Sequence, residues 1–258
     1  MKKQSRTPFD LEKEQYVASP QTKKADMEDL KATEINNIFL EATIYKKAAA
    51  ELVATFILVF AGCGAIMVDT RDKSLNSVGV SAVFGLVIMA LVYTVGHVSG
   101  AHINPAVSIA FASVGKLSLQ ELPVYIISQI VGATAAAAAL NVIITKVSIN
   151  AAVNIPPGNP WASLVVEIII TFMLCFVIFG TATDPKAASG MVGIAAGGIV
   201  ACNGLYAGAL SGCSMNPARS LGPALIALNF KGLWVYILGP IFGGVCGAWF
   251  YKGIYMEE

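Results

Sequence analysis

The tripeptide Asn-Pro-Ala occurs twice in this chain of 258 residues, at Asn104-Pro105-Ala106 and at Asn216-Pro217-Ala218. Each copy follows a Ser-Gly pair by a few residues and opens a short apolar stretch. An asparagine can cap the N-terminus of a helix, and a proline fits the first helical position, where no backbone hydrogen bond is lost. Each tripeptide therefore predicts the start of a helix, with an asparagine amide that can donate a hydrogen bond to a passing oxygen atom.

Long apolar segments surround these motifs. A helix needs about 20 apolar residues to span the hydrocarbon core of a membrane. Six stretches are long enough: about Lys47–Val68, Val78–Val98, Leu122–Thr145, Ala162–Ala182, Met191–Ala209 and Leu233–Ile254. The stretches that begin at the tripeptides, Asn104–Val114 and Asn216–Leu228, are too short to cross. The period-two alternation of a β-barrel is missing. The sequence predicts an all-α membrane protein with six transmembrane helices and two re-entrant half-helices.

The two halves of the chain resemble each other. AELVATFILVF at residues 50–60 matches VEIIITFMLCF at residues 166–176, which places Glu51 opposite Glu167. Each half carries three spans and one half-helix, and because three is odd, the second half must enter the membrane in the opposite direction. We therefore expect an inverted 3+3 repeat, the first copy at about 46–145 and the second at about 160–254, within a channel domain at 46–258.

Two half-helix N-termini that face each other near the midplane add their partial positive charges there. A cation then meets a barrier, while a neutral hydroxyl-bearing molecule is compensated for the water that it loses. The hypothesis is a passive transmembrane channel. Two alternatives stay open: an ion- or proton-coupled secondary transporter with the same inverted repeat, and a non-conducting structural protein. A transporter would need a charged site, and Glu51 and Glu167 are the available groups.

We expect Glu51 and Glu167 to be structural buried carboxylates that accept hydrogen bonds from the irregular loop before each half-helix, because an unpartnered buried carboxylate is too costly to keep. His102 is expected to line or brace the pore mouth on the cytoplasmic side. No nucleophile–base constellation, metal-ligand cluster, phosphate loop or dinucleotide fingerprint is found in the sequence, so we expect no enzyme activity, no cofactor and no metal. The formal net charge of +1 gives no sign of a nucleic-acid partner.

Residues 1–45 are polar and carry charges of both signs, a composition that predicts a disordered N-terminal tail. The distribution of lysine and arginine places this tail and the C-terminus in the cytoplasm. Five cysteines are spread over the chain without metal or disulfide spacing: Cys63, Cys175, Cys202, Cys213 and Cys246.

The segments SGAHINPAVS and SGCSMNPARS, together with AELVATF and VEIIITF, resemble the aquaporin (major intrinsic protein) family from about Lys46 to Tyr251. VVEIIITF, GTATDPKA, SMNPARSLGPAL and GLWVYILGP are similar to its plant nodulin-type (NIP) subfamily. The resemblance implies one pore in each protomer of a homotetramer, in a lipid bilayer that we expect to be the plasma membrane. It implies water and small uncharged solutes as permeants: glycerol first, then boric acid, arsenous acid, ammonia and hydrogen peroxide.

The resemblance also places a selectivity filter at Phe84, Gly204, Cys213 and Arg219. Arg219 would donate hydrogen bonds to permeant oxygens and repel cations, and burying it is costly unless it is solvated or paired. Phe84 would form an apolar wall, and Gly204 would widen the constriction. The alternative for Gly204 is helix packing, because it recurs with Gly208 and Gly212 at four-residue spacing.

Cys213 is expected to turn its thiol into the pore, where a mercurial would block flow. The filter departs from common nodulin-type filters, which have tryptophan at the Phe84 position and alanine at the Cys213 position. Silicic-acid relatives have glycine in place of Phe84, so silicon transport is not expected.

Overall fold

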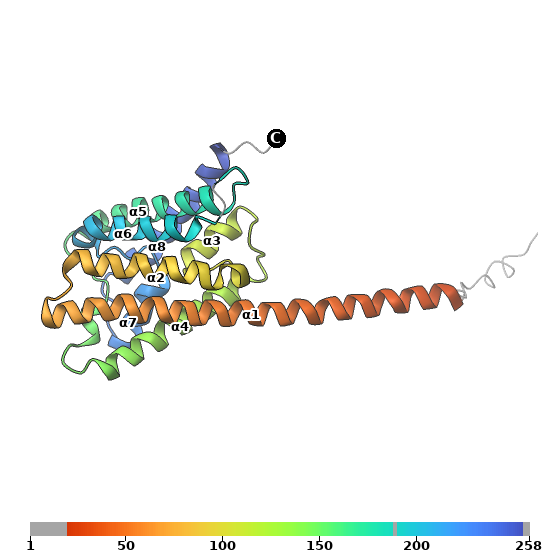
Figure 1. The fold of residues 1–258 in the computed structure, drawn as a ribbon, viewed down its shortest axis with the longest axis horizontal. Helices are drawn as coiled ribbons and strands as arrows, with labels where there is room; N and C mark the ends of the chain where they lie inside the picture. The colour runs from red at the N-terminus through yellow and green to blue at the C-terminus, as the bar shows by residue number, and fades with distance from the viewer. Residues whose placement is uncertain (1–19, 188–189, 255–258) are drawn as a thin grey trace, which may run out of the picture. The chain divides into compact units, whose positions relative to one another are not determined.

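The computed structural model describes residues 20–187 and 190–254, with side chains from residue 43 onward (Figure 1). The chain divides into two compact units, Met1–Thr43 and Ile44–Glu258, and the second contains both tripeptides. Helix α1 begins at Pro20, inside the tail predicted at residues 1–45. Residues 1–19 and the side chains of 20–42 lie outside the described residues, so the disorder of the tail stays a prediction.

The described part of the chain is helical. Its helices are α1 (Pro20–Asp72), α2 (Asn76–Ser99), α3 (Pro105–Ser113), α4 (Leu122–Ile143), the 3₁₀ turn η2 (Ile149–Ala152), α5 (Pro160–Ala182), α6 (Val192–Ser211), α7 (Pro217–Ala227) and α8 (Leu233–Ile254). Six of these are long and apolar enough to span a membrane, with Thr43–Asp72 as the spanning part of α1. Helices α3 and α7 have only 9 and 11 residues, so the predicted pattern of six long and two short helices is confirmed.

The two repeats pack alike. In the first, a Cβ atom added to Gly132 of α4 would clash with the carbonyl oxygen of Leu52 on α1. In the second, a Cβ added to Gly243 of α8 would clash with the carbonyl oxygen of Ile168 on α5. Each pair of long helices thus touches backbone to backbone, a contact that only glycine permits. Helices α2 and α6, one from each repeat, pack against each other, and α6 also packs against α5.

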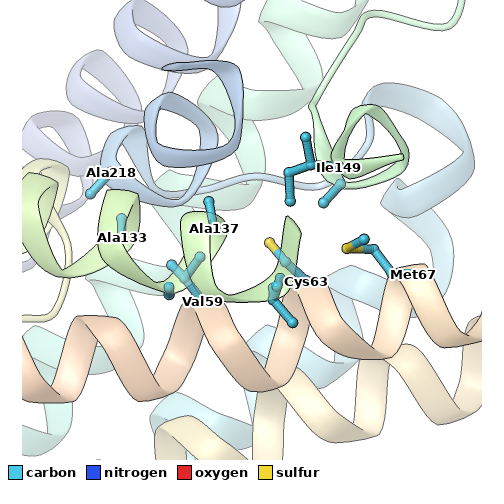
Figure 2. Close-up of a cluster of buried hydrophobic side chains, with 10 residues drawn as sticks. Val59, Cys63, Met67, Ala133, Ala137, Ile149 and Ala218 are labelled. Carbon is cyan, nitrogen blue, oxygen red and sulfur yellow. The ribbon is translucent and has the colours of Figure 1, made fainter. Parts of the chain in front are cut away.

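Small apolar side chains fill the space beside the α1–α4 contact, as Figure 2 shows. The cluster includes Val59, Cys63, Met67, Ala133, Ala137, Ile149 and Ala218. Because Ala218 belongs to the second tripeptide, this core holds α7 of the second repeat against helices of the first. Helix α3 packs in the corresponding way against α8. Each short helix is therefore held by the other half of the chain.

Candidate functional site

The two asparagines cap the short helices, as the sequence predicts. Asn104 Oδ1 accepts a hydrogen bond from the backbone N–H of Ala106 at 2.9 Å. Asn216 Oδ1 accepts from Ala218 at 3.0 Å and from Arg219 at 3.2 Å. Both have extended backbone angles, and the proline that follows each takes the first helical position.

The same asparagines join the two helix N-termini. Asn104 Nδ2 donates to the carbonyl oxygen of Met215 at 2.7 Å, and Asn216 Nδ2 donates to that of Ile103 at 2.8 Å. The predicted head-to-head meeting is therefore observed, and it is reciprocal. Each primary amide carries two hydrogens, and this bond uses one of them. The second N–H of each asparagine is available to another acceptor.

The loops before the short helices have an unusual and repeated backbone. Positive φ angles occur at corresponding places in the two loops: Gly100 (88°), Ala101 (49°) and Ile103 (55°), and Gly212 (91°), Cys213 (45°) and Met215 (53°). Non-glycine residues adopt such angles only where surrounding contacts hold them. The source of that support is a buried carboxylate in each repeat.

In the second repeat this carboxylate is Glu167, which is fully buried. Its Oε1 accepts from Ser211 Oγ at 2.7 Å and from the N–H of Ser214 at 2.9 Å. Its Oε2 accepts from the N–H of Met215 at 2.9 Å. Three donors, one from the last residue of α6 and two from the loop after it, thus converge on one side chain of α5.

Glu51 holds the first loop in the same way and is also fully buried. Its Oε1 accepts from Ser99 Oγ at 2.7 Å and from the N–H of His102 at 2.9 Å, and its Oε2 accepts from the N–H of Ile103 at 2.6 Å. These are the contacts expected of a structural role. They leave each glutamate bound to its loop and not to a permeant.

Four cavities follow one another past this meeting point. The first vestibule (about 350 Å³) and the filter cavity (about 100 Å³) share Gly204 and Arg219 in their walls. The filter cavity and the central cavity (about 50 Å³) share Asn104 and Asn216. The central cavity and the second vestibule (about 410 Å³) share His102. The smallest cavity therefore lies at the asparagine pair, with a wide vestibule at each end of the series.

All four residues predicted for the filter line the filter cavity: Phe84, Gly204, Cys213 and Arg219. Arg219 is 3% exposed, and its guanidinium carbon lies 5.5 Å from the centroid of the Phe84 ring. One terminal nitrogen of Arg219 donates to the carbonyl oxygen of Ala152 at 3.0 Å and to Asn154 Oδ1. Its buried Nε has no hydrogen-bond partner among the described residues. The guanidinium is thus held through one of its terminal nitrogens.

Comparison with known proteins decides what this arrangement is. The family model described as "Major intrinsic protein" matches residues 39–251. The chain belongs to the major intrinsic protein family. Aquaporin NIP1-2 of Arabidopsis thaliana is 47% identical over 215 residues, which are 80% of this chain and 73% of that protein. Aquaporin NIP1-3 of Oryza sativa subsp. japonica is 43% identical over 223 residues, which are 86% of this chain and 78% of that protein.

A solved structure has the same fold. The X-ray structure of the aquaglyceroporin from Plasmodium falciparum matches with a TM-score of 0.74 and 26% identity, over 82% of this chain and 96% of that one. As a major intrinsic protein, the chain is an integral multi-pass membrane protein and a passive channel for water and small neutral solutes. It is a channel and not an enzyme, and the coupled-transporter alternative is set aside.

Asn154 is a partner of Arg219 that the sequence did not reveal. It lies in the loop between η2 and α5, where it is 5% exposed. Its Oδ1 accepts from Arg219 and from Ser220 Oγ, the latter at 2.8 Å, and its Nδ2 donates to the carbonyl oxygen of Gly212 at 3.0 Å. One amide thereby joins the Arg219 guanidinium, Ser220 on helix α7 and the loop before that helix. No spacing rule connects this loop to the tripeptides, so the sequence offered no signal for it.

The three glycines at four-residue spacing on α6 do not form one packing stripe. A Cβ on Gly204 would lie 2.8 Å from Ser81 Oγ on α2, so this glycine does admit a close helix contact. A Cβ on Gly208 would meet no atom within 4 Å, and Gly212 follows the end of α6 with a left-handed backbone. Gly204 and Gly208 both line the filter cavity, and of the two only Gly204 also admits a close helix contact. Ser81, a further lining residue, was missed.

Gln129 was also missed. Its Nε2 donates to Glu51 Oε2 at 2.7 Å and to Ser108 Oγ at 3.0 Å. The tyrosine four residues before it, Tyr125, donates to the carbonyl oxygen of Ser99 at 2.6 Å. The second repeat has the same tyrosine bond, from Tyr236 to Ser211 at 2.6 Å, but Pro240 stands four residues later. The first carboxylate thus has a fourth donor that the second lacks.

His102 lines both the central cavity and the second vestibule, in agreement with the predicted place at a pore mouth. Its Nδ1 lies 3.1 Å from Ser108 Oγ, and its ring lies against those of Phe111 and Tyr125. In the corresponding place of the second repeat, Ser214 Oγ lies 2.5 Å from Ser220 Oγ. The first loop thus has a histidine at the position where the second has a serine.

Cys213 is half-buried and lines the filter cavity. The other cysteines are free: Cys63 and Cys175 are buried, Cys202 is exposed and Cys246 is half-buried. Within the described residues, no three His, Cys, Asp or Glu side chains are grouped so as to hold a metal ion. Among the described cysteines, Cys213 is thus the one that lines the filter cavity.

Proposed function

We propose that the channel conducts water and glycerol, and that Phe84, Gly204, Cys213 and Arg219 form its filter. The observation that carries this proposal is the pairing of a cation with an aromatic face in one narrow cavity. A polyol has hydroxyl oxygens on one side and C–H groups on the other. The Arg219 guanidinium offers N–H donors to the oxygens, and the Phe84 ring offers an apolar wall to the carbons. Boric acid, arsenous acid, ammonia and hydrogen peroxide are further neutral solutes of suitable size.

Exclusion of ions follows from the same groups. Arg219 is a fixed positive charge beside the filter cavity, and the N-termini of α3 and α7 add partial positive charge at the central cavity. A cation would lose its hydration shell where it meets only donors and positive potential. The spare N–H of each asparagine binds the oxygen of a passing neutral molecule, which keeps the dehydration cost of that molecule low. The Plasmodium falciparum protein of similar fold is an aquaglyceroporin, which supports glycerol as a permeant.

We also propose a homotetramer in the plasma membrane, with both termini in the cytoplasm. Large apolar side chains on the outside of the single chain support contacts with lipid or with neighbouring protomers. Among them are Trp161 (65% exposed), Val165 (54%) and Leu238 (56%). Mass measurement of the detergent-solubilised protein tests the assembly: about four times the mass of the 27.0 kDa chain is expected, and a monomer would contradict it.

A pair of matched glycine variants tests the filter. Gly208 lines the filter cavity, and a Cβ atom added to it would meet no other atom within 4 Å. Gly208→Leu therefore places a side chain in the passage without a clash at Cβ. Gly198 lies on the same helix with the same open space but lines none of the four cavities, so Gly198→Leu is the control.

The measurement is stopped-flow light scattering of proteoliposomes exposed to gradients of sucrose, glycerol or boric acid. We expect Gly208→Leu to lower glycerol and boric acid flux several-fold more than water flux. Gly198→Leu should conduct all three like the wild type. Equal losses in the two variants, or unchanged glycerol flux in Gly208→Leu, would reject the filter assignment.

A further inference from the structure

A fifth hollow lies apart from the passage. Its volume is about 240 Å³, and it forms where the chain leaves α3 and where α5 and α8 end. It shares no lining residue with the four cavities of the passage. Figure 1 shows the end of α8 beside the loop that follows α5. The hollow, which we call the lysine pocket, therefore has no part in conducting the permeant.

Two cations and an apolar wall line the lysine pocket. The cations are Lys116, just after α3, and Lys252, in the last turn of α8, while Val114 and Phe179 contribute apolar surface. Both lysines are exposed, and neither forms an ion pair with a described residue. Among the lining residues there is no carboxylate.

The other polar groups at the pocket are already engaged. Thr183 Oγ1 donates to the carbonyl oxygen of Phe179 at 2.8 Å. The hydroxyl of Tyr251 donates to Asp184 Oδ2 at 2.6 Å, and Asp184 Oδ1 accepts from the N–H of Lys186 at 2.7 Å. The nearby carboxylate is thus bound to the tyrosine and to a backbone N–H and does not line the pocket, which leaves the two ammonium groups to meet a ligand.

The depth of the pocket in the membrane follows from Trp249. This side chain is 51% exposed on α8, and Lys252 Nζ lies 5.2 Å from the centroid of its ring. Exposed tryptophans on membrane helices lie at the level of the lipid headgroups, and lysines near helix ends extend their ammonium groups to that level. The pocket therefore opens at the level where lipid phosphates are found.

We propose that the lysine pocket binds the headgroup of an anionic phospholipid, with Lys116 and Lys252 both contacting its phosphate. Basic pockets between membrane helices are suited to such headgroups because two ammonium groups compensate the charge of the phosphate. The bound lipid would connect the end of α3 to the end of α8. Since α3 carries one of the two asparagine caps, the lipid stabilises the end of this short helix that is farthest from the passage.

The test uses the purified full-length protein in neutral detergent and short-chain phosphatidic acid as the probe. Binding is followed by native mass spectrometry and by the rise in melting temperature. The variant is Lys116→Gln/Lys252→Gln, and the matched control is Lys146→Gln/Lys231→Gln, which removes two lysines that line none of the five hollows. A third variant, Lys116→Arg/Lys252→Arg, keeps both charges.

We expect saturable binding to the wild type, to the control and to the arginine variant, and binding roughly 10-fold or more weaker to the glutamine variant. Equal binding in all four proteins would overturn the proposal. So would equal binding of phosphatidylcholine, or displacement of the lipid by inorganic phosphate at similar concentrations, which would assign the site to free phosphate. Water flux should be unchanged in the glutamine variant, so the outcome does not depend on the filter assignment.

Discussion

Replacement of Glu167 by glutamine removes one oxygen from a site where every donor has an acceptor. The carboxylate accepts from Ser211 Oγ, from Ser214 N–H and from Met215 N–H. A glutamine amide has one oxygen, and its NH₂ group would face a donor at the other position. The serine hydroxyl can turn to accept from that NH₂ group, but a backbone N–H cannot. At least one buried backbone N–H is therefore left without an acceptor in Glu167→Gln.

The cost can be estimated from this one lost partner. A buried donor left unsatisfied costs about 1–3 kcal/mol, and hydrogen bonds to a charged group are the stronger kind. We expect the free energy of unfolding to fall by about 2–3 kcal/mol, which for a chain of this size lowers the melting temperature by roughly 4–12 °C. Glu51→Gln should cost a similar amount, because that carboxylate also faces two backbone donors, from His102 and Ile103.

The matched control is a third glutamate. Glu121 is 22% exposed and pairs with Lys47 at 2.7 Å, and a partly exposed ion pair contributes about 0–1 kcal/mol. Thermal unfolding in detergent, followed by tryptophan fluorescence, should rank Glu121→Gln near the wild type and the two buried variants well below it. If Glu167→Gln has the same melting temperature as Glu121→Gln, the Glu167 carboxylate does not hold the loop. If Glu167→Gln is stable and its flux loses a dependence on the proton gradient, a relay role replaces the structural one.

Three further predictions concern the filter and the end of the bundle. Asn154→Ala should lower glycerol flux several-fold in proteoliposomes because the filter guanidinium loses an acceptor, whereas Asn150→Ala, at an exposed amide in η2, should not. Mercuric chloride should block water flux in the wild type and in Cys202→Ser but not in Cys213→Ser, because the thiol that lines the filter cavity is then missing. The pKa of Asp184 is lowered, first by the tyrosine hydroxyl that it binds, so its stabilising effect is present at neutral pH and is lost as pH falls through that lowered pKa. Melting temperatures of the wild type and Asp184→Asn should therefore differ at pH 7 and converge as the pH is brought below the lowered pKa.

Each of these has a clear contrary result. Equal glycerol flux in the two asparagine variants would mean that Asn154 does not position Arg219. Mercurial block that persists in Cys213→Ser would assign the reactive thiol elsewhere. A difference in melting temperature that stays constant as the pH is brought from neutral to below the lowered pKa of Asp184 would mean that its charge does not contribute.

Much of the fold was predictable because its signals are local. A run of apolar residues sets the length of a span, and Asn-Pro sets the start of a short helix; both are read within one segment. The match of Glu51 with Glu167 added the relation between the halves. The filter residues came from the family resemblance, since nothing in the spacing of Phe84 and Arg219 places them 5.5 Å apart.

The missed residues share one property: their roles depend on which segments meet in the folded chain. Asn154 reaches Arg219 from a loop, and Ser81 reaches Gly204 from another helix. Gln129 supports Glu51 although its counterpart in the second repeat is a proline. The glycine spacing on α6 misled in the other direction. A regular four-residue pattern suggested helix packing at every glycine, but a Cβ atom would meet another helix at Gly204 and no atom within 4 Å at Gly208.

The exchange of hydrogen bonds between Asn104 and Met215, and between Asn216 and Ile103, makes the repeats dependent on each other. Neither half can satisfy its own loop carbonyl, because the amide that does so belongs to the other half. A chain of half the length would meet this requirement only by pairing with a second molecule inserted the opposite way round. Duplication followed by fusion would convert that antiparallel pair into one polypeptide, in which the two halves can no longer separate.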